Sequence, residues 1–276
     1  GDYEYQMSVG PHTTQAAHAT TWNEVKATFH RFKNADAIYD SDVGTNRTIY
    51  GGYSTWEKQD VRDNKLKITD AARKQMPTNV YQGMTAYGGY TFTDADAINN
   101  SLTMTGGTVE NLYGAYAKGT GKVEDNKVRL SGGTVKGGII GGHSEGTGVV
   151  HKNTVTVDNA VVEGDVKGGS GKTTVSENEV TIQGNKISKT VHSVVGGDVV
   201  GAYIDGDNSV SRTATGNKVT ITEGDIQNIV YGVYGDFWAS GSAQDTYTPT
   251  VEKNTVTISG GSAKDIRGAY LKRIGT

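Results

Sequence analysis

Short runs in which apolar and polar residues alternate recur along most of the chain. Within residues 154–157, Val155 and Val157 fall on one side and two threonines fall on the other. Alternation with a period of two over β-branched residues is typical of a strand that buries one face. Related runs follow seven asparagines along the chain, which are Asn64, Asn100, Asn126, Asn153, Asn178, Asn217 and Asn254.

The spacing of these asparagines indicates a repeated structural unit. Successive asparagines are 36, 26, 27, 25, 39 and 37 residues apart, so the basic unit has about 26 residues and three units carry insertions. A Gly-rich turn and a second apolar pair, such as residues 134–135, follow each run. A third segment, such as residues 113–116, carries a Gly and Tyr motif. Three short strands in each unit predict an all-β parallel β-helix over residues 46–276, with coils stacked about 4.8 Å apart.

The recurring asparagines have a structural and a functional interpretation. A short amide side chain tolerates left-handed backbone and forms hydrogen bonds with nearby residues, which suits a corner between strands. Amides at the same corner of successive coils can bond to one another along the axis as a ladder. The alternative is a row of ligand-binding amides. We expect the corner ladder.

A row of aromatic residues recurs with the same period. Glycines precede these tyrosines and allow either positive φ or close approach of neighbouring backbone. An inward-facing row would form a stacked core, whereas an outward-facing row would suit sugars or another protein. The core, or a corner of the coil, is the favoured interpretation. The row consists of Tyr53, Tyr90, Tyr116, Tyr203, Tyr234 and Tyr270, and His143 and Ser170 interrupt it.

Residues 1–45 differ from the repeats and predict an N-terminal cap. Residues 21–24 resemble a capping box at the start of a helix. An amphipathic helix of about twelve residues there would cover the open end of the β-helix, and a recognition helix is the alternative. No cap signal follows Tyr270, so we expect the natural chain to continue. The apolar positions of the expected helix are Trp22, Val25, Phe29 and Phe32.

Insertions in a solenoid form loops on particular faces, and such loops often bind partners. Residues 204–216 and 235–253 are enlarged segments after the Gly and Tyr motif. The second segment carries three aromatic residues, and exposed aromatics on a loop are good anchors for a partner. The alternative is that they fold back over the edge of a coil. The candidate binding residues are Phe237, Trp238, Tyr247 and the adjacent Tyr234.

Composition excludes several classes of function. The chain has 276 residues, with 39 Gly, 3 Pro, no Cys and a net charge of −3. Without a basic stripe, nucleic acid is not an expected partner. The absence of Cys excludes thiolate zinc sites and disulfides, and the six His residues have no metal-ligand spacing. We therefore expect no cofactor and no metal.

Acidic residues provide the one indication of catalysis. Some β-helices cleave polysaccharides with paired carboxylates about 5–9.5 Å apart. Asp165, Asp198, Asp205 and Asp207 lie close together in the repeat pattern, and residues 205–208 contain enough oxygens to suggest a Ca²⁺ loop. Because Asp-Gly pairs are ordinary turn residues, we expect turn acids and no catalytic residues.

The repeated phrases at residues 217–221, 132–135 and 50–53 resemble those of bacterial autotransporter passenger domains, over about residues 46–276. The resemblance implies a right-handed β-helix that is exported through the outer membrane and displayed at the cell surface or secreted. Attachment to the membrane would require a C-terminal β-barrel that these residues do not include. A serine-protease domain with its Gly-Asp-Ser-Gly motif is also missing, which favours the adhesins of this family.

An adhesin would bind a host surface protein, a glycan or another copy of itself. The alternatives are a β-helix polysaccharide hydrolase or lyase, and a passive stalk that binds nothing.

Overall fold

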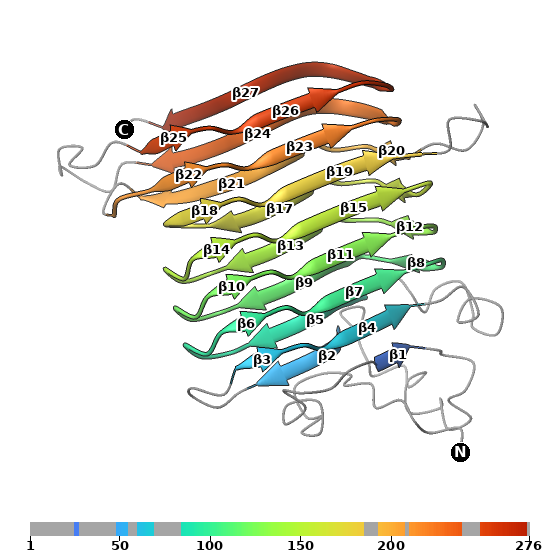
Figure 1. Cartoon of the computed structure of the whole chain (residues 1–276), viewed down its shortest axis with the longest axis vertical. Helices are drawn as coiled ribbons and strands as arrows, with labels where there is room; N and C mark the ends of the chain where they lie inside the picture. Colours follow the sequence, from blue (N-terminus) through green and yellow to red (C-terminus); the bar gives the residue numbers. More distant parts are fainter. Residues whose placement is uncertain are drawn as a thin grey trace.

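The computed structural model of the chain is a parallel β-helix whose coils stack in sequence order (Figure 1). The structure describes residues 25–27, 48–54, 60–68, 84–184, 193–207, 210–238 and 249–274. Every strand pair within these residues is parallel, because each segment bonds to the equivalent segment of the next coil. The predicted all-β solenoid is therefore confirmed. The described residues contain no helix long and apolar enough to cross a membrane.

Three sheets run along the stack within the described residues. The first sheet contains the Asn-led strands β1 (Val25–Ala27), β4 (Lys65–Ile68), β7 (Ser101–Met104), β11 (Lys127–Leu130), β15 (Thr154–Asp158), β19 (Glu179–Gln183), β23 (Lys218–Ile221) and β26 (Thr255–Ile258). The second sheet contains β3 (Val61–Arg62), β6 (Ala97–Ile98), β10 (Val123–Glu124), β14 (Val150–His151), β18 (Thr174–Ser176), β22 (Thr213–Thr215) and β25 (Thr250–Glu252).

The third sheet contains the strands that carry the Gly and Tyr motif. These are β2 (Thr48–Ser54), β5 (Thr85–Thr91), β9 (Asn111–Ala117), β13 (Ile139–Ser144), β17 (Val166–Gly171), β21 (Val199–Asp207), β24 (Asp225–Trp238) and β27 (Ser262–Ile274). The short strands of this sheet are β8 (Thr108–Val109), β12 (Thr134–Val135), β16 (Val161–Val162) and β20 (Val194–Val195), and β20 pairs with the start of β24.

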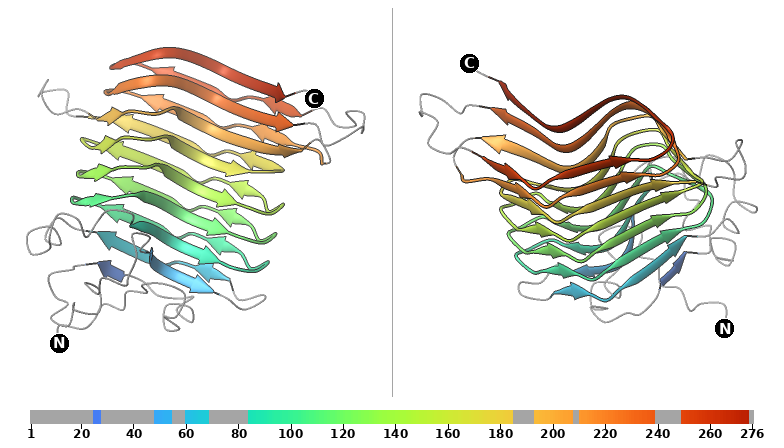
Figure 2. Two further views of the ribbon diagram at one scale, coloured as in Figure 1. Left: turned by 180° about the vertical axis from the view of Figure 1, so that it is seen from behind. Right: turned by 45° about the horizontal axis from the view of Figure 1, so that its top comes forward.

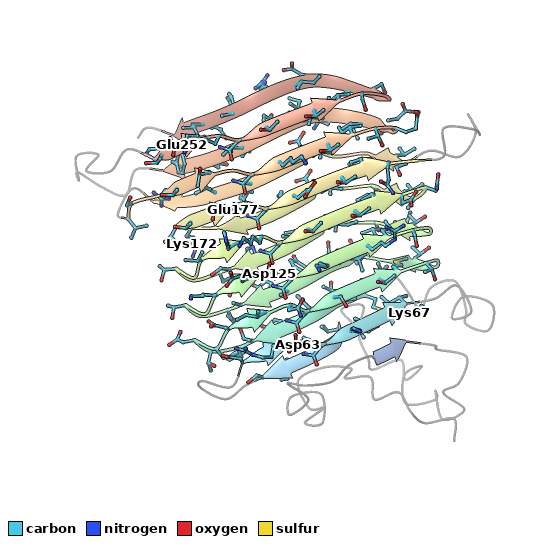
Figure 3. All side chains as sticks on the ribbon, viewed as in Figure 1. Asp63, Lys67, Asp125, Lys172, Glu177 and Glu252 are labelled. Carbon is cyan, nitrogen blue, oxygen red and sulfur yellow. The ribbon has the colours of Figure 1, made fainter. Side chains whose placement is uncertain are left out.

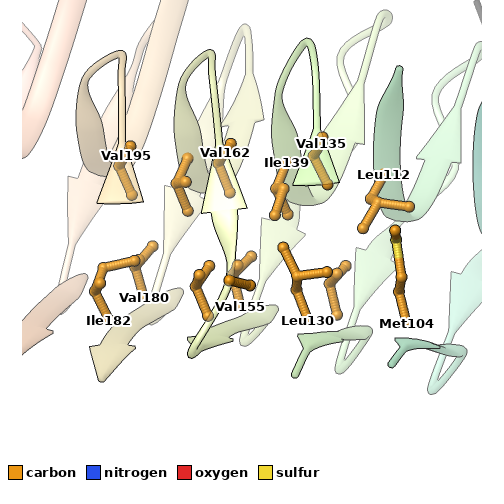
Figure 4. Close-up of a cluster of buried hydrophobic side chains, with 14 of the residues drawn as sticks. Met104, Leu112, Leu130, Val135, Ile139, Val155, Val162, Val180, Ile182 and Val195 are labelled. Carbon is orange, nitrogen blue, oxygen red and sulfur yellow. The ribbon is translucent and has the colours of Figure 1, made fainter. Parts of the chain in front are cut away.

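Two apolar clusters fill the interior of the coils. The first lies between the first and third sheets, where side chains such as Leu130, Ile139 and Val155 are fully buried (Figure 4). The second lies between the second sheet and the later half of the long third-sheet strands, and it includes Val150 and Ile204. Strand alternation explains this arrangement, because the inward residues of each coil stack on the same residue type in the next coil.

The corner between the second and first sheets confirms the predicted asparagine ladder. Asn126 is fully buried, and its Nδ2 donates hydrogen bonds to Asn153 Oδ1 at 3.0 Å and to the carbonyl oxygen of Ala97 at 2.8 Å. The backbone N–H of Asn126 also donates to Asn153 Oδ1, at 3.1 Å. The same pattern of bonds runs from Asn64 to Asn254.

The residue before each ladder asparagine turns the chain with left-handed backbone, and φ lies between 52° and 69° at these positions. Figure 3 shows Asp63, Asp125 and Glu177 following one another along the stack. A sharp corner at this point directs each asparagine inward. The seven residues are Asp63, Asn99, Asp125, Lys152, Glu177, Gly216 and Lys253.

The predicted N-terminal helix is wrong at residues 25–27, which form β1. This strand pairs in parallel with β4, and Val25 lies opposite Leu66. Pairing satisfies the backbone groups at the edge of β4, which a helix would leave unpaired. In sequence, Asn23 precedes Val25 by two residues, as Asn64 precedes Leu66, so this segment is a weaker copy of the Asn-led strand. The other residues of the expected helix, Trp22, Phe29 and Phe32, lie outside the described residues.

Candidate binding site

Each long strand of the third sheet bends at a glycine, which a second glycine follows in β2, β5, β13 and β17. In β5, Tyr87 and Tyr90 both lie on the outer face, while Ala86 and Thr91 are fully buried. Residues three apart in a regular strand face opposite sides, so the bend at the two glycines brings both rings to one side. Their ring centroids are 5.2 Å apart at an angle of 79°. The outer face is therefore concave along the bend (Figure 2).

Close approach of backbone, and not positive φ, explains the first glycine of each pair. A Cβ on Gly168 would lie 2.6 Å from the carbonyl oxygen of Gly201 in the next coil, which is inside any normal contact. A Cβ on Gly169 would instead lie 2.6 Å from Nδ2 of Asn178 in the ladder. The first position is glycine throughout, at Gly51, Gly88, Gly114, Gly141, Gly168, Gly201, Gly232 and Gly268.

Two columns of side chains line the bend on the outer face of the third sheet, and we call the surface between them the tyrosine groove. The inner column consists of the residues just before the first glycine, and the outer column consists of the residues two positions after it. The inner column is Tyr50, Tyr87, Tyr113, Ile140, Lys167, Val200, Tyr231 and Arg267. The outer column is Tyr53, Tyr90, Tyr116, His143, Ser170, Tyr203, Tyr234 and Tyr270.

Rings of successive coils stack within each column. The Tyr90 and Tyr116 centroids are 5.2 Å apart with an interplanar angle of 6°, and those of Tyr203 and Tyr234 are 5.6 Å apart at 7°. Most of the row lies away from the main core, because the two large apolar clusters occupy the other face of these strands. Tyr50 and Tyr53 are nevertheless buried and form a third cluster with Tyr87 and Tyr90. The expected core position is therefore wrong for the row as a whole, while its place beside the bend agrees with the expected corner. The predicted interruption at His143 and Ser170 is confirmed.

The phenols and the imidazole of the groove are neutral at pH 7. Desolvation, with smaller contributions from nearby phenols and carboxylates, raises the pKa of Tyr90 and of Tyr203 to about 12. Desolvation also lowers the pKa of His143 to about 4, and its Nδ1 lies 3.1 Å from Ser170 Oγ. The groove therefore presents phenol rings and one neutral imidazole, together with the cations Lys167 and Arg267 of the inner column.

A hollow of about 190 Å³ opens in the groove where the inner column loses its tyrosines. The inner column has Lys167 and Val200 there, while the outer column keeps Tyr203 and Tyr234. Smaller or flexible side chains leave space that rings fill elsewhere. The residues that border the hollow are Asp165, Lys167, Asp198, Val200, Tyr203, Tyr234 and Asp236.

Two of the carboxylates at the hollow also hold the backbone together. Asp165 Oδ1 accepts a hydrogen bond from the N–H of Asp198 at 2.9 Å, and Asp198 Oδ1 accepts one from the N–H of Ile229 at 3.1 Å. Asp165 Oδ2 lies 3.1 Å from Lys167 Nζ. These contacts give Asp165 and Asp198 a structural role in addition to any role in binding.

Of the other acidic candidates, the structure describes only the side chain of Asp205. Asp205 does not border the hollow, and desolvation raises its pKa. The side chain of Asp207 lies outside the described residues. Within the part of the chain that the structure describes, no three His, Asp or Glu side chains are grouped to hold a metal ion.

Of the four predicted binding residues, the structure describes the side chains of two, Tyr234 and Phe237. Tyr234 borders the hollow. Phe237 is only 5% exposed and belongs to the second apolar cluster, so its prediction as an exposed anchor is wrong. Alternation along β24 explains this, because Tyr234 faces outward and a residue at an odd spacing faces inward. The side chain of Trp238 and the whole of Tyr247 lie outside the described residues.

Sequence reasoning did not recognise that the first residue of each Gly and Tyr motif forms a second column, and it assigned neither Lys167 nor Asp236 to a site. The signal was the spacing of the two tyrosines around the glycine pair, since a bend at the glycines is needed for both rings to share a face. Comparison of the chain with known protein families, with curated proteins and with solved structures gave no match.

Proposed function

We propose that this chain is an adhesin that binds its partner through the tyrosine groove and is displayed at a bacterial cell surface. One observation carries the proposal, which is the double column of partly buried tyrosines on the outside of the stack. A soluble protein has no need to hold so many rings outside its core, and tyrosine is strongly enriched at contact sites.

The groove suits an extended partner. Its side chains repeat with the rise of the coils, about 4.8 Å, and are fixed by the sheet beneath them. Rigid rings lose little conformational entropy on binding, and their hydroxyl groups remain able to form hydrogen bonds. A host surface protein, a glycan chain or a second copy of this chain meets these requirements.

The test compares two pairs of substitutions on opposite faces. Tyr90→Ala with Tyr116→Ala removes two stacked rings from the groove, and Thr156→Ala with Thr181→Ala shortens two neighbouring side chains of the first sheet. Beads coated with each variant are applied to host cells, to immobilised glycans and to surfaces coated with the same chain. We expect the tyrosine pair to weaken attachment about tenfold or more, and the threonine pair to leave it unchanged.

Folding of each variant is checked by circular dichroism, and Tyr90→Phe with Tyr116→Phe retains the rings if the alanine pair unfolds. Attachment that survives in a folded variant carrying Tyr90→Ala and Tyr116→Ala would overturn the proposal.

One observation favours a second candidate, a polysaccharide hydrolase or lyase. Three carboxylates, those of Asp165, Asp198 and Asp236, border the same hollow. Against catalysis, Asp165 and Asp198 already accept backbone hydrogen bonds. The test is an assay for reducing sugar released from a panel of polysaccharides. Sustained release that is lost in Asp198→Asn would favour a polysaccharide hydrolase or lyase over an adhesin.

A further inference from the structure

One contact recurs in the tyrosine groove: a cation lies between a carboxylate and a tyrosine ring. Lys167 Nζ is 3.1 Å from Asp165 Oδ2 and 4.4 Å from the centre of the Tyr203 ring. Arg267 Nε is 2.9 Å from Asp265 Oδ2, and its Cζ is 4.9 Å from the centre of the Tyr270 ring. In both coils the carboxylate precedes the cation by two residues.

A third coil repeats this arrangement without a cation. Asp198 directly precedes Val199, which pairs with Val166, so Asp198 occupies the position of Asp165. Val200 lies opposite Lys167. The rings are present as well, because Tyr203 and Tyr234 stack with centroids 5.6 Å apart. Among the described residues, no cation forms an ion pair with Asp198.

The hollow lies at this third copy. Asp198, Val200, Tyr203 and Tyr234 all border it, together with Asp236. Asp236 Oδ1 is buried without a hydrogen-bond partner, and its Oδ2 lies 4.0 Å from Lys272 Nζ. The border has three carboxylates and one ammonium, so its net formal charge is −2. This net charge favours a cationic occupant, and the carboxylates at the border offer it hydrogen-bond acceptors.

We propose that the hollow binds an organic cation, an ammonium or guanidinium group on a slim aliphatic stem, such as the side chain of Lys or Arg on a partner protein. The head group lies between Asp198 and Asp236 and over the Tyr234 ring, and the stem packs on Val200. The volume supports a single head group, since sites for larger ligands occupy about 300–1,000 Å³. This inference rests on the proposed binding function and names the chemistry that one part of the groove recognises.

The direct test is a titration followed by NMR of the Val200 methyl and Tyr234 ring signals. The probes are the N-acetyl methylamides of lysine and arginine, and putrescine as a free amine. The N-acetyl methylamide of norleucine is the neutral control, because it keeps the stem and lacks the charge. We expect saturable shifts for the cations, at least about tenfold weaker binding of norleucine, and weakening by added salt.

Variants locate the site. Val200→Lys supplies an internal ammonium in the position of Lys167 and is expected to abolish the cation-dependent shifts of Tyr234. Asp198→Asn and Asp236→Asn keep the shape and are each expected to weaken binding about tenfold. Asp265→Asn, in the coil that already has its own cation, is the matched control and should leave the titration unchanged.

Equal binding of norleucine, or an unchanged titration in both Asp198→Asn and Asp236→Asn, would overturn the inference. Binding of putrescine alone would support the cation site while excluding a protein side chain as its source. The attachment test uses Tyr90 and Tyr116, which do not border the hollow, so the two proposals fail separately.

Discussion

At the scale of single residues, one amide per coil holds the corner. Asn153 uses its whole side chain, because Nδ2 donates to Val123 O at 2.9 Å and to Asn178 Oδ1 at 3.0 Å. Its Oδ1 accepts from both the backbone N–H and Nδ2 of Asn126. All these groups are buried, so no water replaces a lost partner. The ladder is therefore a row of mutually dependent hydrogen bonds.

Replacing Asn153 by Ala should lower the free energy of unfolding by about 2–4 kcal/mol, because several buried polar groups lose partners at once. Urea unfolding followed by circular dichroism measures the change. Thr154→Ala, at the next residue and on the outward face of β15, is the matched control and should cost less than about 1 kcal/mol. A cost for Asn153→Ala equal to that of the control would contradict a cooperative ladder.

The sequence was sufficient to predict this ladder because its asparagines recur in phase with the strands. It was not sufficient to predict the direction of the tyrosines. A regular strand places Tyr87 and Tyr90 on opposite faces, and only the bend at their glycine pair places both outside. Phe237 was misjudged for the converse reason, since β24 continues with ordinary alternation where a loop was expected.

At the scale of the strand, the glycine pair shapes the groove. The two positions differ in what surrounds them, because a Cβ on Gly168 would meet backbone while a Cβ on Gly169 would meet the Asn178 side chain. Other coils have Ala115, Ala202 and Val233 at the second position, so the structure accommodates a side chain there. The bend therefore depends chiefly on the first glycine.

Gly168→Ala should lower the free energy of unfolding by about 3 kcal/mol, because the carbonyl of Gly201 is fixed by the sheet and cannot move aside. Gly169→Ala is the matched control in the same coil, with an expected cost of about 1 kcal/mol. Chemical unfolding of both variants checks the order. Equal costs at the two positions would show that the stack adjusts its coil spacing freely.

The expected N-terminal helix failed at the same scale. Trp22, Val25, Phe29 and Phe32 fit a helical period in sequence, yet Val25 belongs to a strand. A helical period in the sequence takes no account of the unpaired backbone groups at the edge of β4, because that edge exists only in the assembled stack. The fold was predictable because every coil repeats one pattern, and the segment that departs from the pattern was judged from local signals alone.

At the scale of the whole molecule, the groove concentrates phenols in one environment. Burial is the main cause that raises the pKa of Tyr90 and of Tyr203 from 10.0 to about 12, and it raises the pKa of Tyr50, Tyr87 and Tyr116 further. A phenol whose pKa is higher in the folded chain holds its proton there while the unfolded chain loses it. The stack is thus most stable, with respect to these groups, below pH 10.

Stability should therefore fall steeply between pH 10 and about pH 12, because in this window the folded chain binds more protons than the unfolded chain. Urea unfolding at a series of pH values measures the slope, and ultraviolet absorbance of tyrosinate reports ionisation. We expect ionisation and unfolding to coincide, since the groove tyrosines ionise when the stack opens. Tyr90→Phe removes one titrating group from the outer column. The slope of the unfolding free energy against pH should then be shallower, by an amount that corresponds to at most one bound proton. Tyrosines that ionise near pH 10 while the circular dichroism stays native would contradict the desolvated groove, and would point to rings that water reaches freely.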